Sequence, residues 1–421
     1  MKNMKFLIAL LLLLAQIHVK AQTWFPIASG TSKNLNSIHF PSANVGYICG
    51  DDSLLLKTTD GGLTWNPINF SGINLTGWNN NILNLQFLTD SIGYLAAGPY
   101  SDTYKTVDGG LNWTVNASVG ANCYNQGMFF FDADNGFIGG SGCFQGELIE
   151  RLANGIWTPA TMNSPTGNSS NLIVDIDFYN AQLGLAASAG GLIFRTSDGG
   201  LNWDSISVTP DLNPLTSVLM VNDTLAYAGY ISLSLGFGLY ISTDGGLTWA
   251  QDLNSATFFY PDFLALHKSG DGKIYSGGFS QGSATGLIFS SPGDVITWNY
   301  DQVTQSINSI SSYNDSIVFA VGDSGLIVVN KTLTSLPVFE LSPAALHIDI
   351  FPNPAHHSIQ LTLPNGIESK GAVVSIYSLA GQLISINPLK GSIDISTLAA
   401  GEYIIEVLSA NKRAVGRFLV K

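Results

Sequence analysis

Two aspartates that flank a single residue are the side chains of this chain best spaced for catalysis. Asp175 and Asp177 lie on either side of Ile176 in a strand-like segment, so both carboxylates point to the same face. Two carboxylates roughly 5 to 9.5 Å apart can cleave a glycosidic bond. Four more aspartates fall in predicted loops and could take part: Asp51, Asp52, Asp102 and Asp262. The alternative, which we favour, is that these carboxylates cap turns or face solvent.

Other reaction types find little support. His39 and His267 are isolated in the sequence, and His356 and His357 lie near the C-terminus. The sequence has no phosphate-binding loop. It therefore predicts no cofactor, no metal site and no assigned catalytic residue.

The string Asp-Gly-Gly-Leu-(Thr/Asn)-Trp occurs four times and reveals how the chain is built. Each copy lies between strand-like segments, so it predicts a hairpin turn whose glycines take positive φ and whose aspartate accepts backbone hydrogen bonds. The tryptophan would cover the hairpin with an apolar ring. The residues with this predicted structural role are Asp60, Gly62 and Trp65; Asp108, Gly110 and Trp113; Asp198, Gly200 and Trp203; and Asp244, Gly246 and Trp249.

The spacing of the strings predicts a ring of repeated sheets. Two neighbouring pairs of tryptophans lie 48 and 46 residues apart, a period typical of propellers and other arrays. Weaker copies of a strand, turn and Gly-aromatic pattern bring the number of units to seven. The last unit has no outer strand, and the segment around Trp24 fits the missing position. We expect an all-β chain with a seven-bladed β-propeller over residues 22–331, closed by its N-terminal strand.

The repeated string resembles the Asp-box of sialidase-like β-propellers, in which the box lies on the face away from the usual active site. Sialidases hold the substrate carboxylate with three arginines, but this propeller has only Arg151 and Arg195. Sialidase activity is therefore not expected. The propeller also resembles the photosystem II stability/assembly factor-like group, which implies a rigid disc that binds a partner without chemistry.

Both ends of the chain carry export features. Residues 1–21 have basic residues, an apolar run and a small-residue cleavage site, as a secretory signal peptide does. No apolar stretch is long enough to span a bilayer. The formal charge of −13 argues against nucleic acid and anionic membranes as partners.

Three cysteines follow the predicted signal peptide. Cys123 and Cys143 fall in loops of one predicted blade that emerge on the same face, so a disulfide between them is one interpretation and two free thiols the other. Cys49 would then be unpaired, and we expect a small buried side chain there.

The repeat ends before residue 332. Residues 332–343 are typical of a linker, and residues 344–421 return to short alternating strands that predict a small β-sandwich. Segments such as Ile350-Phe-Pro-Asn-Pro354 and the terminal Arg417-Phe-Leu-Val-Lys421 resemble the C-terminal sorting domain of proteins exported by the type IX (Por) secretion system of Bacteroidetes. The resemblance implies contact with that machinery and a place at the outer-membrane surface or outside the cell.

Aromatic residues gather in the loops predicted on the face opposite the Asp-boxes. Aromatic rings among Asn and Ser suit sugar stacking or a protein partner, and the alternative is packing between blades. The candidate binding residues are Trp78, Tyr100, Tyr124, Tyr230, Phe258 and Tyr260.

These features favour a secreted or surface-displayed module that binds glycan or protein without catalysis. A polysaccharide-active hydrolase or lyase using propeller aspartates is the second hypothesis, and a structural surface or matrix protein is the third. Fold alone does not decide between them.

Overall fold

The computed structural model describes residues 24–73, 80–97, 102–117, 122–142, 146–164, 172–208, 213–231, 238–252, 261–280, 285–293, 298–314, 317–331, 346–364, 369, 372–378, 383–389, 391–409 and 412–421. Strands dominate these residues, and a single 3-10 turn at Asp323–Gly325 is the one helical element within them. The prediction of an all-β chain is confirmed for this part of the sequence. The predicted signal peptide and the predicted linker lie outside it.

Between Phe25 and Lys331 the described residues form seven sheets. The first three are β2 (Leu35–His39), β3 (Gly46–Gly50), β4 (Leu54–Thr58) and β5 (Asn66–Pro67); β6 (Ile82–Phe87), β7 (Gly93–Ala97), β8 (Thr103–Thr106) and β9 (Thr114–Ala117); and β10 (Asn122–Asp132), β11 (Asn135–Gly142), β12 (Gly146–Ala153) and β13 (Ile156–Pro159). The fourth is β15 (Ile173–Phe178), β16 (Gly184–Ser188), β17 (Leu192–Thr196) and β18 (Asn202–Ser207), with β14 (Thr161–Asn163) parallel to β18.

The remaining three sheets complete the series. They are β19 (Leu215–Met220), β20 (Ala226–Tyr230), β21 (Gly238–Ser242) and β22 (Ala250–Gln251); β23 (Pro261–Lys268), β24 (Ile274–Ser280), β25 (Gly286–Ser291) and β26 (Asn299–Val303); and β27 (Ile307–Asn314), β28 (Ile317–Gly322) and β29 (Ile327–Lys331), joined by the N-terminal β1 (Phe25–Ile27). The β1–β29 pairing is antiparallel and sets Phe25 opposite Val329, so the first strand completes the last sheet.

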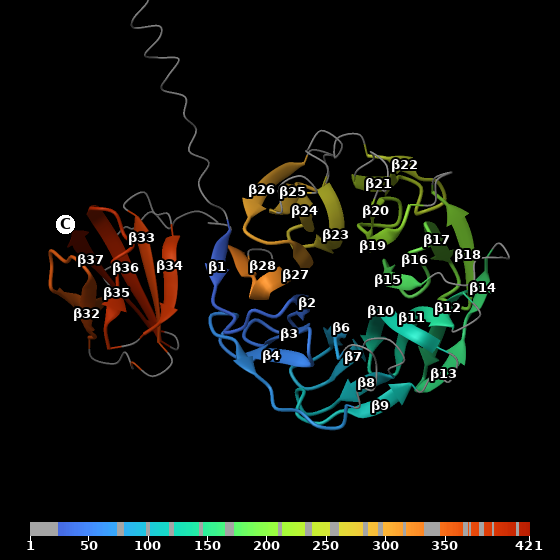
Figure 1. Cartoon of the computed structure of the whole chain (residues 1–421), viewed down its shortest axis with the longest axis horizontal. Coiled ribbons are helices and arrows are strands. Elements are labelled where there is room, and N and C mark those ends of the chain that lie inside the picture. The colour runs from blue at the N-terminus through green and yellow to red at the C-terminus, as the bar shows by residue number, and fades with distance from the viewer. Residues whose placement is uncertain are drawn as a thin grey trace, which may run out of the picture.

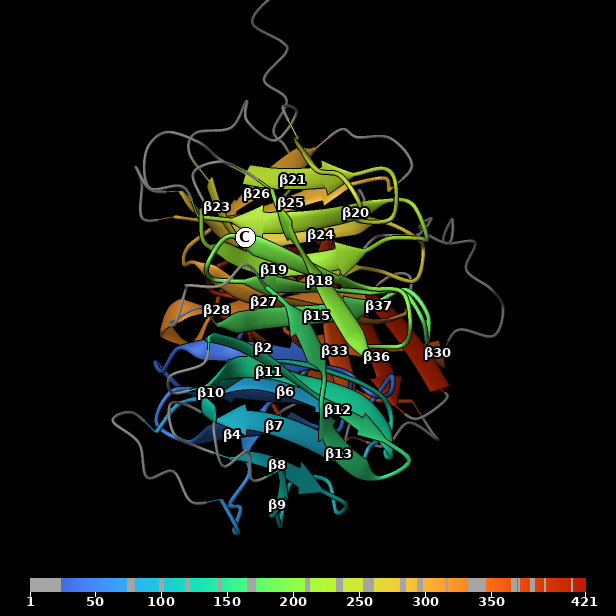
Figure 2. The ribbon, with the colours of Figure 1, turned by 90° about the vertical axis from the view of Figure 1, so that its right-hand side faces the viewer.

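The sheets stand around a common axis (Figure 1), and Figure 2 shows the same ring edge-on. One end strand of each sheet is innermost, and we call these strands, β2, β6, β10, β15, β19, β23 and β27, the inner strands. Each inner strand contacts the next along the chain, and β27 contacts β2. The contacts between inner strands therefore run around the whole ring.

The strand paired with each inner strand forms the packing layer between neighbouring sheets. Every residue of β3, β7, β16 and β20 is buried, as expected for strands covered on both faces. Tyr47 in β3 stacks on Phe87 of the next sheet and donates its hydroxyl to the Asp90 carbonyl at 2.6 Å. This contact explains the repeated Gly-aromatic pattern: the aromatic residue joins one sheet to the next.

The Asp-box turns have the expected hydrogen bonds. Asp198 Oδ1 accepts the Thr196 hydroxyl at 2.9 Å and the Asn202 N–H at 3.0 Å. Gly199 donates its N–H to the Gln182 carbonyl in the turn between β15 and β16. The Asp-box turns thus lie beside the turns that follow the inner strands, and we call this end of the ring the box face. In the second box, hydrogen bonds from Asn112 lower the pKa of Asp108 to about 2.

The C-terminal strands form a separate pair of sheets, drawn in orange and red in Figure 1. One contains β30 (Leu346–His347), β37 (Lys412–Val420), β36 (Gly401–Ser409), β33 (Val373–Ser378) and β34 (Leu383–Pro388), and the other contains β31 (Asp349–Phe351), β32 (Ser358–Thr362) and β35 (Ile393–Asp394). Ile359, Val374, Ile405 and Phe418 belong to one buried cluster that draws on both sheets.

The second glycine of the box is required for two reasons that can be separated experimentally. Gly200 has a φ of 77°, and a Cβ at this position would clash with the Phe137 ring. Gly272 has a φ of 83°, but a Cβ there would meet nothing. Gly200→Ala should lower the free energy of unfolding by about 3 kcal/mol and Gly272→Ala by about 1 kcal/mol, measured by chemical denaturation. Equal losses would show that packing on Phe137 has no role.

Candidate binding site at the mouth of the central channel

All seven inner strands carry a β-bulge at the same point. In each strand one register shift leaves a residue unpaired in its first half, and β10 and β27 have further shifts. Bulges re-aim side chains and twist the strand away from further pairing. The seven bulge residues are Asn36, Leu83, Gln126, Val174, Thr216, Leu264 and Asn308.

Polar bulge residues donate hydrogen bonds to the next inner strand. Asn36 Nδ2 donates to the Ile82 carbonyl at 3.0 Å, and Asn308 Nδ2 donates to the Leu35 carbonyl at 3.1 Å. The Thr216 hydroxyl donates to the carbonyl of Phe263. In each case the acceptor is the residue just before the bulge of the following sheet.

Residues further along the inner strands accept backbone N–H groups from the next strand. Immediately after the bulge, Asp175 Oδ2 accepts from Val218 at 2.9 Å, and Ser309 Oγ accepts from Ile38 at 3.3 Å. Two residues later the same pattern recurs. There, side chains again accept backbone N–H groups: His39 from Phe87, Gln86 from Phe130 and Asp177 from Met220. We call these side chains, together with Asn36, Thr216 and Asn308, the inner-strand girdle.

Asp175 and Asp177 therefore occupy girdle positions that Ser309, His39 and Gln86 fill in other sheets. Burial raises the pKa of Asp175 to about 7 and that of Asp177 to about 6, although backbone N–H groups donating to both carboxylates oppose the shift. Asp177 also lies near the Lys268 charge, which lowers its pKa. The structure does bring the two aspartates together, but it uses each carboxylate as a backbone acceptor.

A polar cavity of about 170 Å³ opens where the inner strands begin. Every inner strand contributes to its wall. Its polar lining residues are Asn36, Ser37, Asn84, Gln126, Asp175, Thr216, Ser217, Asn308 and Ser309. Because most of these residues lie in the first half of their strands, the cavity lies at the end of the channel opposite the box face, and we call this end the mouth face.

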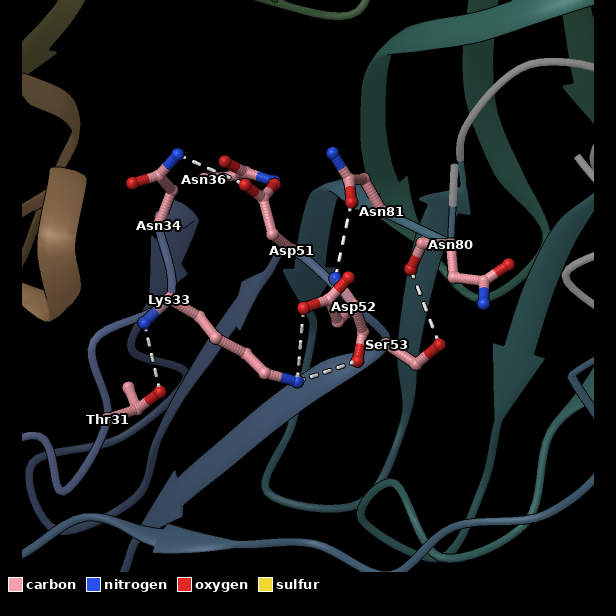
Figure 3. A network of polar contacts seen from close by, with 9 residues as sticks. All are labelled: Thr31, Lys33, Asn34, Asn36, Asp51, Asp52, Ser53, Asn80 and Asn81. Atoms are coloured by element: carbon pink, nitrogen blue, oxygen red, sulfur yellow. Dashed lines mark hydrogen bonds and ion pairs between the residues drawn. The ribbon is translucent and has the colours of Figure 1, made fainter. Parts of the chain in front are cut away.

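A hydrogen-bonded network fixes part of the rim of the mouth face (Figure 3). The Asp51 carboxylate accepts from Asn34 Nδ2 and Asn36 Nδ2, both at 3.1 Å. Asp52 pairs with Lys33 at 3.6 Å, and its N–H donates to Asn81 Oδ1 at 3.2 Å. These contacts tie the turn between β3 and β4 to the segment that leads into β6, so Asp51 and Asp52 serve as rim anchors.

Two buried histidines lie deeper in the channel. Burial lowers the pKa of His39 to about 4, and burial together with the His39 charge does the same for His267. His267 Nε2 shares a hydrogen bond of 2.7 Å with the Ser312 hydroxyl. In the described residues no group of three or more His, Cys, Asp or Glu side chains is placed to hold a metal ion.

Both propeller arginines bind the box turn of the following sheet. Arg151 Nε donates to the Gly199 carbonyl at 2.9 Å, and Arg195 Nε donates to the Gly245 carbonyl at 2.8 Å. Their guanidinium groups lie on the box face, so they do not meet at the channel mouth. Cys49 is a buried free thiol whose pKa is raised by burial.

One predicted binding aromatic is corrected by the structure. The expectation of an exposed ring is wrong for Tyr230, which is only 2% exposed and stacks on Tyr240 inside the fold. The other five predicted binding residues stay predictions, because Trp78, Tyr100, Phe258, Tyr260 and the side chain of Tyr124 lie outside the described residues. The predicted disulfide between Cys123 and Cys143 also stays a prediction, because Cys143 and the side chain of Cys123 lie outside the described residues.

One further string in the sequence has the form of a nucleophile motif. Gly278-Phe-Ser-Gln-Gly282 matches Gly-x-Ser-x-Gly, which in hydrolases places the serine on a turn between a strand and a helix. Ser280 instead is buried at the end of β24, and that strand pairs with β25, the next strand along the chain. Gly278, Phe279 and Ser280 therefore belong to a sheet strand.

The girdle and its cavity are the functional features that sequence reasoning missed. A faint signal existed, because polar residues recur near the starts of most inner strands. The residue type differs from strand to strand, however, so no motif emerges.

Two parts of the chain match known sequence families. Residues 349–421 match the family model described as a secretion system C-terminal sorting domain, and residues 240–251 match the BNR/Asp-box repeat. The chain carries a type IX sorting domain. That domain implies export by the type IX system to the cell surface or the extracellular space.

The ring resembles known propellers. The photosystem II assembly lipoprotein Ycf48 of Nostoc sp. is 27% identical over 288 residues, covering 57% of this chain and 81% of that protein. The solved structure of YCF48 bound to D1 peptide covers 75% of this chain and 98% of its own, with a TM-score of 0.56 at 16% identity. The solved structure of the GH74 enzyme of Niastella koreensis covers 94% of this chain and 67% of its own, with a TM-score of 0.57 at 13% identity. These structures establish the propeller fold.

Among the residues that the structure describes, no helix has the length and hydropathy of a membrane span.

The buried carboxyls make a prediction about stability and pH. Their pKa values are raised in the folded state, so protonation favours folding. The contribution of these two groups to the free energy of unfolding of the wild type therefore falls as pH rises from about 4 to about 7. In the double variant Asp175→Asn, Asp177→Asn, the free energy of unfolding relative to wild type should therefore increase across that window. The increase should be at most about 1.4 kcal/mol per pH unit for each group. Chemical denaturation at several pH values measures it, and a pH-independent difference would contradict the burial of these charges.

Proposed function

We propose that this chain is an exported, non-catalytic recognition protein that binds a neutral glycan at the mouth face. In this proposal residues 22–331 form a seven-bladed propeller closed by β1, residues 332–343 are the linker, and residues 344–421 form a β-sandwich that serves export. The Asp-boxes are structural. A protein partner is the alternative occupant of the same face.

The composition of the cavity carries the proposal. Seven inner strands converge on it, and most of its polar lining consists of amide and hydroxyl groups. Such groups match the donors and acceptors of sugar hydroxyls, and convergent polar groups in a concave site are the usual mark of a ligand site. The network around Asp51 holds part of the rim rigid, which reduces the entropy lost on binding.

The girdle argues against the hydrolase hypothesis. A catalytic carboxylate must be free to exchange a proton with the substrate or attack it. Asp175 accepts from the N–H groups of Ile176 and Val218, and Asp177 accepts from that of Met220. Likeness to a GH74 enzyme at 13% identity extends to the fold alone.

A glycan array probed with the full chain tests the binding site. Gln126 lines the cavity from β10, and Gln126→Ala should reduce affinity for any retained neutral glycan about tenfold because an amide contact inside the cavity is lost. The matched control is Leu247→Ala, which removes an exposed side chain from an Asp-box turn on the opposite face and should leave affinity unchanged.

Other outcomes of the array would reject the site or the ligand. Equal affinity of wild type and Gln126→Ala would place glycan binding elsewhere on the protein. A blank array would favour a protein partner. The structurally similar YCF48 was solved bound to D1 peptide, so peptides would then be the next probes.

Export makes a separate prediction. A chain ending before residue 349 lacks the whole region matched by the sorting-domain model. It should accumulate inside the outer membrane, while the full chain reaches the surface or the medium. Protease accessibility on intact cells measures the difference, and equal surface exposure of both chains would rule out a role of this domain in export.

A further inference from the structure

A groove of about 440 Å³ lies beside the cavity on the mouth face, at the end of the last sheet. One bank is formed by residues 28–31, which lead from β1 to β2, and the other by residues 304–305, which lead from β26 to β27. The floor is formed by residues 324–326, between β28 and β29, together with parts of β1 and β29. Because each bank runs from an outer strand to an inner strand, the groove leads from the channel outward.

A single residue, Asp323, separates the groove from the cavity. Asn308 lines the cavity, and its Nδ2 donates to Asp323 Oδ1 at 2.9 Å. The next residue, Ser324, lines the groove, and its N–H donates to Asn34 Oδ1 at 3.0 Å. Asn34 in turn donates to Asp51 in the rim network. A ligand that occupies the cavity can therefore extend over Asp323 into the groove.

The floor of the groove is fixed to both banks. The Asp323 N–H donates to the carbonyl of Ser306, which follows one bank, at 3.1 Å. Gly325 lies so close to the Thr31 carbonyl of the other bank that a Cβ would clash with it. The groove thus has a defined shape without a ligand, which reduces the entropy lost on binding.

The residues that line the groove carry no ionisable side chain. Their polar side chains are hydroxyls and one amide, and they belong to Ser29, Thr31, Thr304, Gln305 and Ser324. Thr304 and Ser324 are exposed and Gln305 is half-buried, so these three side chains are open to a ligand. Uncharged donors and acceptors match the hydroxyl groups of neutral sugars.

The groove is poorly suited to a peptide. An extended peptide usually adds a strand to an open sheet edge, but the end strand of this sheet is β1, and Pro26 at its centre has no N–H to donate. Proline-rich segments bind grooves lined by aromatic rings, and the lining of this groove has none. Its chemistry therefore favours a glycan.

We propose that the groove is a second subsite of the mouth face and that the ligand is a neutral oligosaccharide, with one sugar unit in the cavity and the following units in the groove. The inference rests on the proposed glycan-binding function and specifies the size of the glycan. The volume of the cavity, about 170 Å³, lies below the range of about 300–1,000 Å³ that is usual for ligand sites. Cavity and groove together fall within that range.

Size ladders of neutral glycans test the subsite. The full chain is titrated with glucan, mannan, galactan and xylan oligomers, each from the monosaccharide to the hexasaccharide. In any ladder that binds, affinity should rise about tenfold from the monosaccharide to the trisaccharide, because the groove adds hydrogen bonds. The gain should be the same at low and high salt, because the lining is uncharged.

Two variants assign the gain to the groove. Gln305→Ala should reduce affinity for the trisaccharide about fivefold and leave affinity for the monosaccharide unchanged, whereas Gln126→Ala in the cavity should weaken both alike. Ser324→Gly removes a groove hydroxyl at a φ of 55°, which glycine adopts freely. It should weaken the trisaccharide about threefold, and it keeps the test decisive if Gln305→Ala does not fold. The matched control is Gln302→Ala, which removes an exposed amide of β26 outside the groove and should change neither affinity.

The outcomes separate this inference from the proposed function. A monosaccharide that binds as tightly as its trisaccharide, in a Gln126-dependent manner, would retain the proposed function and overturn the inference. A gain with length that survives both Gln305→Ala and Ser324→Gly would also overturn it, because the longer glycans would then leave the cavity by another route. Binding of no ladder would overturn both.

Discussion

Unpaired strand edges around a common axis are the constraint on which the rest of this structure depends. Each inner strand pairs with its own sheet on one side, and its other side faces the channel. Exposed edges with free N–H and C=O groups are costly and invite wrong pairing. The girdle satisfies such groups with side chains from the neighbouring inner strand. Asp175, Asn36 and Gln86 thus act as hydrogen-bonding partners that join one sheet to the next.

This constraint also accounts for the candidate site. The bulges turn side chains toward the axis, and most of the side chains that line the wall are polar, so a polar cavity forms where the inner strands begin. On the box face the aspartates bond within their own turns, as between Asp244 and Thr248, and the arginines of the preceding sheet bind the turn carbonyls. A ligand site at the mouth face therefore follows from the way the ring is held together.

The sequence predicts the ring far better than the site. The Asp-box has a fixed residue order because Gly200 needs both positive φ and close packing on Phe137, and such demands leave a visible repeat. The girdle demands only a polar atom at a given place. Serine, aspartate, glutamine and histidine all meet that demand, so equivalent positions share no residue type. The bulges shift the alternation by one residue and hide the pattern further. The buried ring of Tyr230 shows the related difficulty that a sequence does not tell whether an aromatic residue near a loop faces outward.

Hydrogen exchange of individual backbone amides tests the girdle most directly. The amides of Val218 and Met220 lie on the channel side of β19 and donate to Asp175 and Asp177. The girdle predicts that both exchange as slowly as amides inside the sheets, and much more slowly than those of Asn66 in β5 and of the β22 residues, which are exposed. Rapid exchange at both positions would show that the inner edges are open to water, and would contradict the account of how the ring is closed.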